Sequence, residues 1–171
     1  EWAVSYETRV EDGPNAPGHQ VQKGLVPAVF HSGRLFVAPS DANSAFCIEA
    51  DSGRIQWQFS YLRSVPDLPD LLRREQDRNR GRDKQWRHVL GIVPGGTSGR
   101  LIVSGNSLWA IDMETGLVVW ERPLGNSSRG NRGDFGRGLI AGGQVLVPTR
   151  ESLGIFDAST GDHLLQKQLN E

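Results

Sequence analysis

A nine-residue motif occurs three times in the chain, and this repetition limits the possible folds more than any local pattern does. Each copy has an acidic residue first, Ser or Thr fourth, Gly fifth and a large apolar residue last. The copies occupy residues 49–57, 112–120 and 157–165, so their glycines lie 63 and then 45 residues apart. Repeats at such spacing indicate a row of similar structural units, each stabilised by its neighbours.

Each copy of the motif is typical of a β-hairpin. One apolar run enters the first copy at 45–48 and a second leaves it at 55–59. Two apolar runs separated by a short polar stretch with glycine favour a pair of strands. The acidic residue and the Ser or Thr can bond to backbone N–H groups of the turn, and glycine can adopt the positive φ that the turn requires.

Another pair of apolar runs precedes each hairpin, so each repeat contains four short strands. These runs are 25–30 and 34–38, then 89–93 and 100–104, then 138–141 and 144–147. A repeated four-stranded antiparallel sheet is the unit, or blade, of a β-propeller. We therefore predict an all-β fold, a partial β-propeller of about three blades.

The prediction treats the 171 residues as a single partial propeller. Its parts are the last strand of a preceding blade (1–10), a blade (24–60), an insertion (61–88), a blade (89–124), a loop (125–137) and a blade (138–169). Closed propellers contain roughly four to eight blades, so three cannot close a ring. We expect the chain either to belong to a longer protein, whose remaining blades cover its apolar end faces, or to form a homo-oligomer.

The motif residues are predicted to be structural, because they recur once in every repeat. We expect the acids to hold the turns, the glycines to permit them, and the tryptophans to be buried between packed blades. These residues are Glu49, Gly53, Trp57, Asp112, Gly116, Trp120, Asp157 and Gly161. We assign no catalytic, cofactor-binding or metal-binding residue, since the four histidines are scattered and no nucleophile motif occurs.

Residues 110–120 and 33–37 resemble the repeats of pyrroloquinoline quinone (PQQ) enzyme-type β-propellers. That superfamily includes the quinoprotein alcohol dehydrogenases and an outer-membrane assembly lipoprotein. The chain departs from the family's repeat at two positions: Glu49 stands where the family has Asp, and Leu165 stands where it has Trp. WD40 propellers are the alternative type, but the Trp-Asp pair of their signature does not occur in this chain.

The resemblance implies the fold and leaves the activity open, because one fold hosts many functions. In the family's dehydrogenases, PQQ lies between a Trp and a vicinal disulfide, with a calcium ion and a catalytic Asp. This chain has a single cysteine, Cys47, so we predict no PQQ site and no other cofactor. We predict a non-catalytic scaffold or protein-interaction module. Part of a PQQ-dependent dehydrogenase is the alternative, and a hydrolase, lyase or polysaccharide binder with its site on rim loops is a third possibility.

Two segments lie outside the repeat. Residues 61–88 contain eight Lys or Arg and five Asp or Glu, and the order of Asp67, Pro69 and Asp70 is typical of a helix start. We interpret a short helix near 67–80 as a solvated surface element, with a docking patch for an acidic partner as the alternative. The glycine-rich residues 125–138 are interpreted as an inter-blade connection, with a binding loop as the alternative.

Composition adds further limits. The net charge of −1 and the mixed charges of the insertion argue against nucleic acid as a partner. The apolar runs are too short for a transmembrane helix. Cys47 lies between Phe46 and Ile48, so we expect a small buried residue. The residues themselves do not indicate a compartment; only the family resemblance favours the periplasm or the extracellular space.

Overall fold

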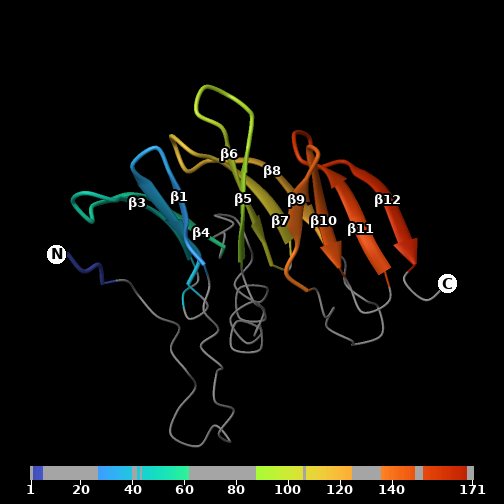
Figure 1. Cartoon of the computed structure of the whole chain (residues 1–171), viewed down its shortest axis with the longest axis horizontal. Coiled ribbons are helices and arrows are strands. Elements are labelled where there is room, and N and C mark those ends of the chain that lie inside the picture. The colour runs from blue at the N-terminus through green and yellow to red at the C-terminus, as the bar shows by residue number, and fades with distance from the viewer. Residues whose placement is uncertain are drawn as a thin grey trace, which may run out of the picture.

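The structure is a computed structural model, and it describes residues 2–5, 27–39, 42, 44–61, 88–105, 107–124, 136–148 and 152–168. These residues form three four-stranded antiparallel sheets and contain no helix. The sheets stand side by side in chain order and fan out around one edge (Figure 1). We call them blades 1, 2 and 3.

Each blade has its four strands in sequence order from one edge to the other. Blade 1 contains β1 (Val29–His31), β2 (Arg34–Val37), β3 (Ser44–Glu49) and β4 (Ile55–Ser60). Blade 2 contains β5 (His88–Val93), β6 (Arg100–Ser104), β7 (Ser107–Asp112) and β8 (Val118–Pro123). Blade 3 contains β9 (Leu139–Ala141), β10 (Gln144–Pro148), β11 (Ser152–Asp157) and β12 (His163–Gln168). Strand β5 contacts β9, so the first strands of blades 2 and 3 lie next to each other.

The predicted fold class, an all-β partial propeller of four-stranded blades, is confirmed. The helix predicted near 67–80 lies outside the described residues, as does most of the loop 125–137. Of the strand predicted in residues 1–10, only residues 2–5 are described, and these are not in a strand. No helix in the described part of the chain is long and apolar enough to span a membrane.

A β-bulge recurs between the third and fourth strands of every blade. The register shifts between Cys47 and Ile48, between Ala110 and Ile111, and between Ile155 and Phe156. In each case one residue of the last strand is left without a partner opposite; these residues are Gln56, Val119 and Leu164. A bulge increases the local twist and redirects the side chain that follows. The next residue, Trp57 in blade 1 and Trp120 in blade 2, then reaches the neighbouring blade.

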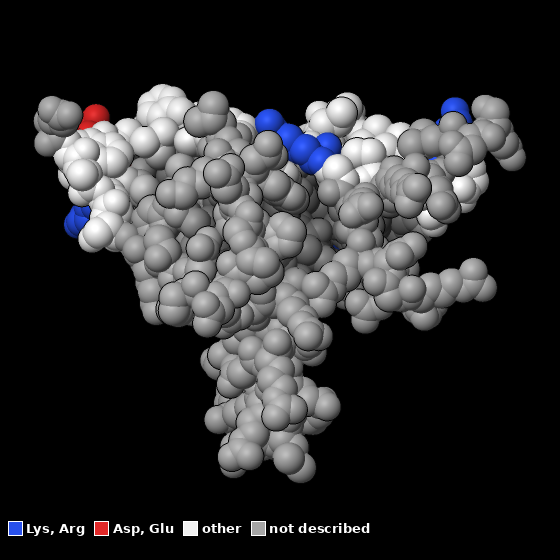
Figure 2. All heavy atoms as spheres, turned by 90° about the horizontal axis from the view of Figure 1, so that it is seen from below, with Lys and Arg blue, Asp and Glu red and all other residues white. Residues whose placement is uncertain are grey.

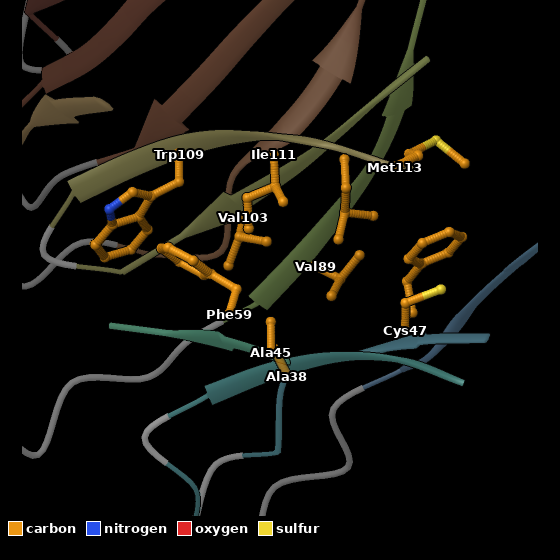
Figure 3. Packing of buried hydrophobic residues seen from close by; sticks show 11 residues of the cluster. Ala38, Ala45, Cys47, Phe59, Val89, Val103, Trp109, Ile111 and Met113 are labelled. Atoms are coloured by element: carbon orange, nitrogen blue, oxygen red, sulfur yellow. The ribbon is translucent and has the colours of Figure 1, made fainter. Parts of the chain in front are cut away.

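The core consists of layers between the blades. The layer between blades 1 and 2 combines small and aromatic residues of blade 1 with aliphatic residues and a Trp of blade 2 (Figure 3). Its buried members are Phe36, Ala38, Ala45, Cys47, Phe59, Val89, Leu101, Val103, Trp109, Ile111 and Met113. Burial of one such large apolar side chain contributes about 1.5–3 kcal/mol, so each blade depends on its neighbour for much of its stability.

The layer between blades 2 and 3 is built in the same way, from residues that include Ile102, Leu108 and Trp120 on one side and Val145 and Phe156 on the other. A smaller cluster of Ala42, Phe46 and Ile48 lies on the other face of blade 1, where Val4 packs against it. The N-terminal residues therefore cover part of the face that blade 1 turns away from blade 2.

Candidate functional site: the junctions between blades

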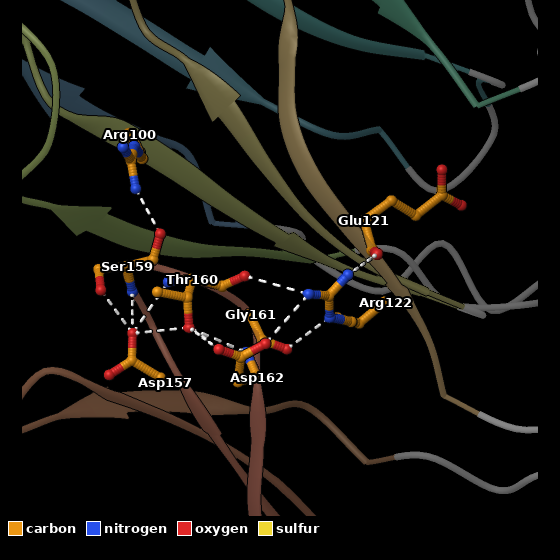
Figure 4. Close-up of polar contacts among 8 residues, drawn as sticks. All are labelled: Arg100, Glu121, Arg122, Asp157, Ser159, Thr160, Gly161 and Asp162. Carbon is orange, nitrogen blue, oxygen red and sulfur yellow. Dashed lines mark hydrogen bonds and ion pairs between the residues drawn. The ribbon is translucent and has the colours of Figure 1, made fainter.

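The motif acids of blades 2 and 3 accept hydrogen bonds from their own turns. The Asp112 carboxylate accepts hydrogen bonds through Oδ1 from Glu114 N (3.1 Å), Thr115 N (2.9 Å) and Thr115 Oγ1 (2.9 Å). Asp157 Oδ1 accepts from Ser159 Oγ (2.5 Å), Ser159 N (2.8 Å) and Thr160 N (2.9 Å), as Figure 4 shows. Donors that favour the ionised carboxylate lower its pKa, and they do so for both residues.

The motif acid of blade 1 makes a different contact. Glu49 is one methylene longer than aspartate, and its carboxylate accepts a hydrogen bond from the Ser52 hydroxyl and lies 3.5 Å from Arg54 Nε. The backbone of the turn is nevertheless the same in all three blades. The acid's N–H donates to the carbonyl five residues later, and its carbonyl accepts from the motif glycine. The glycine and the main chain therefore define the turn, and the acid supports it.

The motif glycines leave room for tryptophans of the preceding segment. Gly53, Gly116 and Gly161 have φ values of +73°, +71° and +75°, and a Cβ on each would lie 2.6–2.8 Å from ring atoms of a tryptophan. The rings belong to Trp2, Trp57 and Trp120 respectively. Real Cβ atoms do not approach so closely, so glycine is required both by the backbone conformation and by the ring above it. Trp57 and Trp120 thus lock each blade to the next.

The indole N–H groups add a second contact at two of the three junctions. Trp2 Nε1 donates to Ala50 O (2.8 Å), and Trp57 Nε1 donates to Met113 O (2.9 Å). Both carbonyls belong to the residue directly after the motif acid. Trp120 Nε1 is buried and has no acceptor among the described residues. The junction between blades 2 and 3 therefore lacks a hydrogen bond that the junction between blades 1 and 2 has.

Two arginines that the sequence analysis did not single out also join the blades. Arg34 donates to Met113 O (3.2 Å) and to both carboxylate oxygens of Glu114 (3.0 and 3.1 Å), which also accepts from Ser98 Oγ (2.8 Å). The hydrogen bond from Arg34 is the main cause of the lowered pKa of Glu114. Arg100, which corresponds to Arg34 in the strand register, donates to Ser159 O of blade 3 (Figure 4). A Gly-Arg pair, 33–34 and 99–100, was the signal in the sequence that could have identified them.

A third arginine belongs to the junction between blades 2 and 3 alone. Arg122 Nε donates to Gly161 O (2.9 Å), and Arg122 Nη2 lies 3.2 Å from Asp162 Oδ1 (Figure 4). Blade 1 has the apolar Phe59 at the equivalent position, two residues after the motif tryptophan. In the view of Figure 2, the Lys and Arg side chains of the described residues appear as separate groups, so no continuous charged patch is visible on the described part of this face.

Two titratable side chains lie inside the stack. Burial raises the pKa of the Cys47 thiol to about 11, as expected for a thiol in the layer between blades 1 and 2. Burial, and next the charge of Arg137, lower the pKa of His88 at the start of β5. His88 Nδ1 is buried without a hydrogen-bond partner in the described part of the chain. Burial favours the neutral form of both groups.

The described residues do not fit PQQ in the manner of the dehydrogenases that the sequence resembles. Cys47 is the chain's single cysteine, and its side chain is within the core layer. Trp57 and Trp120 each cover a glycine, and Trp109 packs against Phe59 with ring centroids 6.1 Å apart. These rings are engaged in blade packing, so they offer no stacking surface for a planar cofactor. Among the described residues, no group of three or more His, Cys, Asp or Glu is placed to hold a metal ion.

Comparisons with known proteins agree with this architecture. A family model of PQQ-repeat type, described as outer membrane protein assembly factor BamB, matches residues 2–171. The chain resembles the crystal structure of BamB from Moraxella catarrhalis, with 17% identity and a TM-score of 0.53 over 85% of this chain and 37% of that chain. It also resembles the quinohemoprotein alcohol dehydrogenase ADHIIG from Pseudomonas putida HK5, with 18% identity and a TM-score of 0.54 over 82% of this chain and 20% of that chain.

A europium-containing methanol dehydrogenase is similar to the same degree, with 16% identity and a TM-score of 0.54 over 81% of this chain and 23% of that chain. At these identities the likeness shows the fold alone. The chain spans 20–37% of the length of the three proteins. No curated protein matches the chain.

Proposed function

Because the chain belongs to the PQQ-repeat family whose model is described as outer membrane protein assembly factor BamB, we propose that it is a non-catalytic propeller segment that acts as a rigid scaffold for a protein partner. The family's description concerns assembly of outer membrane proteins. We accordingly place the proposed partner among proteins and the proposed location in the periplasm or at the outer membrane.

One observation carries this proposal: the charged side chains of the repeat are engaged in holding turns and joining blades. Asp112 and Asp157 accept hydrogen bonds from their own turns, and Glu114 is held by Arg34 of the preceding blade. The pKa of each of these carboxyls is lowered. A general acid or base works best with a pKa near the working pH. These carboxylates are better suited to structural than to proton-transfer roles.

The same observation supports rigidity, which a scaffold requires. The Trp57 ring, its N–H group and the Arg34 guanidinium all reach the same turn of blade 2. These three contacts together restrict movement of the two sheets relative to each other. Loops on such a framework can be presented to a partner in a fixed arrangement, as binding loops of other rigid scaffolds are.

Reconstitution with PQQ tests the proposal against a dehydrogenase function. The purified chain would be incubated with PQQ and Ca²⁺, desalted, and examined for a quinone absorbance band and for alcohol-dependent reduction of a dye. We expect no band in stoichiometric amount and no dye reduction above that of the urea-unfolded chain treated in the same way. A stoichiometric band together with alcohol-dependent dye reduction would overturn the proposal in favour of a quinoprotein dehydrogenase.

A further inference from the structure

The outward face of blade 3, turned away from blade 2, is built like the covered faces of blades 1 and 2. The strand registers place Leu146, Leu153 and Ile155 where blade 1 has Phe36, Ala45 and Cys47, and blade 2 has Ile102, Leu108 and Ala110. The residues of blades 1 and 2 at these positions are buried against the next blade. On blade 3, Leu139 and Leu165 are 53% and 55% exposed. The centre of this face is therefore apolar, like the corresponding covered faces of blades 1 and 2.

The outward face of blade 3 lacks the tryptophan and the arginine through which blades 1 and 2 contact the next blade. Leu165 pairs with Ile155 as Trp57 pairs with Cys47, so leucine stands in the place of the tryptophan. Gln144 pairs with Asp157 as Arg100 pairs with Asp112, so glutamine stands in the place of the arginine. The outward face offers neither a ring to cover a glycine nor a guanidinium to reach a carbonyl.

The loss of the ring removes the steric requirement for glycine in whatever sheet covers blade 3. A Cβ on Gly161 would lie 2.6 and 2.7 Å from two ring atoms of Trp120, and the next nearest atom is 3.2 Å away in Arg122. Leucine lacks the indole ring that makes the two shortest contacts. A sheet stacked on Leu165 can therefore carry a side chain at that turn position, provided that the residue tolerates a positive φ.

A second copy of this chain does not complement the face. The face it would offer in the same head-to-tail arrangement is that of blade 1, where the chain's own Trp2 already covers Gly53 and bonds to Ala50 O. Blade 1 also has Phe46 where blade 2 has Trp109 and blade 3 has Gly154. Small Ala45 and Cys47 face the sheet with Trp109, whereas the outward face of blade 3 has the larger Leu153 and Ile155. Bulky residues on both sides of a layer overpack it.

We propose that the outward face of blade 3 binds a further four-stranded sheet, not a second copy of this chain. That sheet does not require glycine at the turn position that faces Leu165, and it has a small residue opposite Leu153 and Ile155. The proposal concerns only which sheet covers the outward face of blade 3. It does not depend on whether the whole protein is catalytic.

A fusion protein tests the first part of the proposal. The full chain would be followed by a second copy of residues 125–168. This copy supplies a fourth sheet whose Gly154 would lie opposite Leu153 and Ile155 of the original blade 3. We expect urea unfolding in one transition with a midpoint above that of the 171-residue chain, because covering Leu139 and Leu165 stabilises blade 3. An unchanged midpoint for blade 3, or separate unfolding of the added sheet, would overturn the proposal.

Substitutions in the same fusion test the glycine requirement. Asparagine tolerates positive φ, so Gly161→Asn mainly reports the collision with a ring. We expect Gly161→Asn in the original blade 3, facing Trp120, to lower the urea midpoint by roughly 0.5–1 M, from typical overpacking costs and urea slopes. In the added blade, facing Leu165, it should leave the midpoint nearly unchanged, and Leu165→Trp should restore the sensitivity. Equal effects of the substitution in both blades would show the inference to be wrong.

Sedimentation of the unmodified chain tests the choice of partner. We expect a monomer over the accessible concentration range, with the same sedimentation coefficient for Leu165→Lys. A concentration-dependent dimer that Leu165→Lys abolishes would assign the face to a second copy of the chain and would overturn the proposal.

Discussion

The glycine under each tryptophan is subject to two constraints that a matched pair of substitutions can separate. Gly33 and Gly116 have nearly the same φ, +74° and +71°. A Cβ on Gly33 would meet no atom within 4 Å, whereas a Cβ on Gly116 would lie 2.8 Å from ring atoms of Trp57. Alanine at either position would be strained by the left-handed backbone conformation, but only alanine at position 116 would also collide with a ring.

We therefore expect Gly33→Ala to cost about 1–2 kcal/mol, the strain of a left-handed alanine, and Gly116→Ala to cost about 1–3 kcal/mol more from overpacking. The free energy of unfolding from urea titrations of both variants measures the difference. Equal costs would mean that the Trp57 ring moves aside freely and does not lock blade 2.

The tryptophans themselves form a second matched pair. Trp57 Nε1 donates to Met113 O, while Trp120 Nε1 is buried and has no acceptor among the described residues. Replacement by phenylalanine keeps a ring and removes the N–H group. Trp57→Phe loses a hydrogen bond, whereas Trp120→Phe relieves an unsatisfied donor. We expect the first to cost about 1–3 kcal/mol more than the second in urea unfolding. A larger cost at Trp120 would show that its N–H group has an acceptor in solution.

At the scale of the hairpin, the three turns share a backbone and differ in how well the acid supports it. Asp112 Oδ1 accepts three hydrogen bonds, two of them from backbone N–H groups. The Glu49 carboxylate accepts from the Ser52 hydroxyl, and its interaction with Arg54 is an exposed ion pair. By analogy with helix caps, Asp112→Ala should cost about 1–2 kcal/mol, and Glu49→Ala less than about 1 kcal/mol. Thermal unfolding of the two variants provides the comparison, and a larger effect at Glu49 would contradict the geometry.

The hairpins show how far the sequence alone could lead. The repeat predicted the four-stranded sheets because apolar runs and a turn signature are local patterns. The β-bulge before Trp57 and the reach of Arg34 to Met113 could not be read from such patterns, because both depend on the register between strands and between blades. The cross-strand bond from Gln58 Nε2 to Ser44 Oγ (2.9 Å), repeated between Gln166 and Ser152 (2.8 Å), was missed for the same reason.

At the scale of the whole molecule, stability should depend on pH in two separate ranges. Burial, and next Arg137, lower the pKa of His88 below its ordinary value of 6.5. In the unfolded chain the imidazole takes up a proton near pH 6.5. Below that pH the unfolded chain therefore binds more protons than the folded chain, and stability falls. This contribution is fully present above about pH 6.5 and is lost as the pH approaches the lower, folded-state pKa.

The carboxyl groups of the turns and of the blade junction affect stability in a lower pH range, and again stability falls as the pH falls. Hydrogen bonds lower the pKa of Asp112, Asp157 and Glu114 in the folded chain. Their contribution is present above about pH 4, where the unfolded carboxyls are also ionised, and is lost as the pH falls through the folded-state pKa values. Urea midpoints measured from pH 8 to pH 3 should therefore fall in two steps. His88→Gln should remove the step that begins near pH 6.5 and leave the acidic step. Superimposable curves for the two proteins above about pH 4 would rule out His88 as the group responsible.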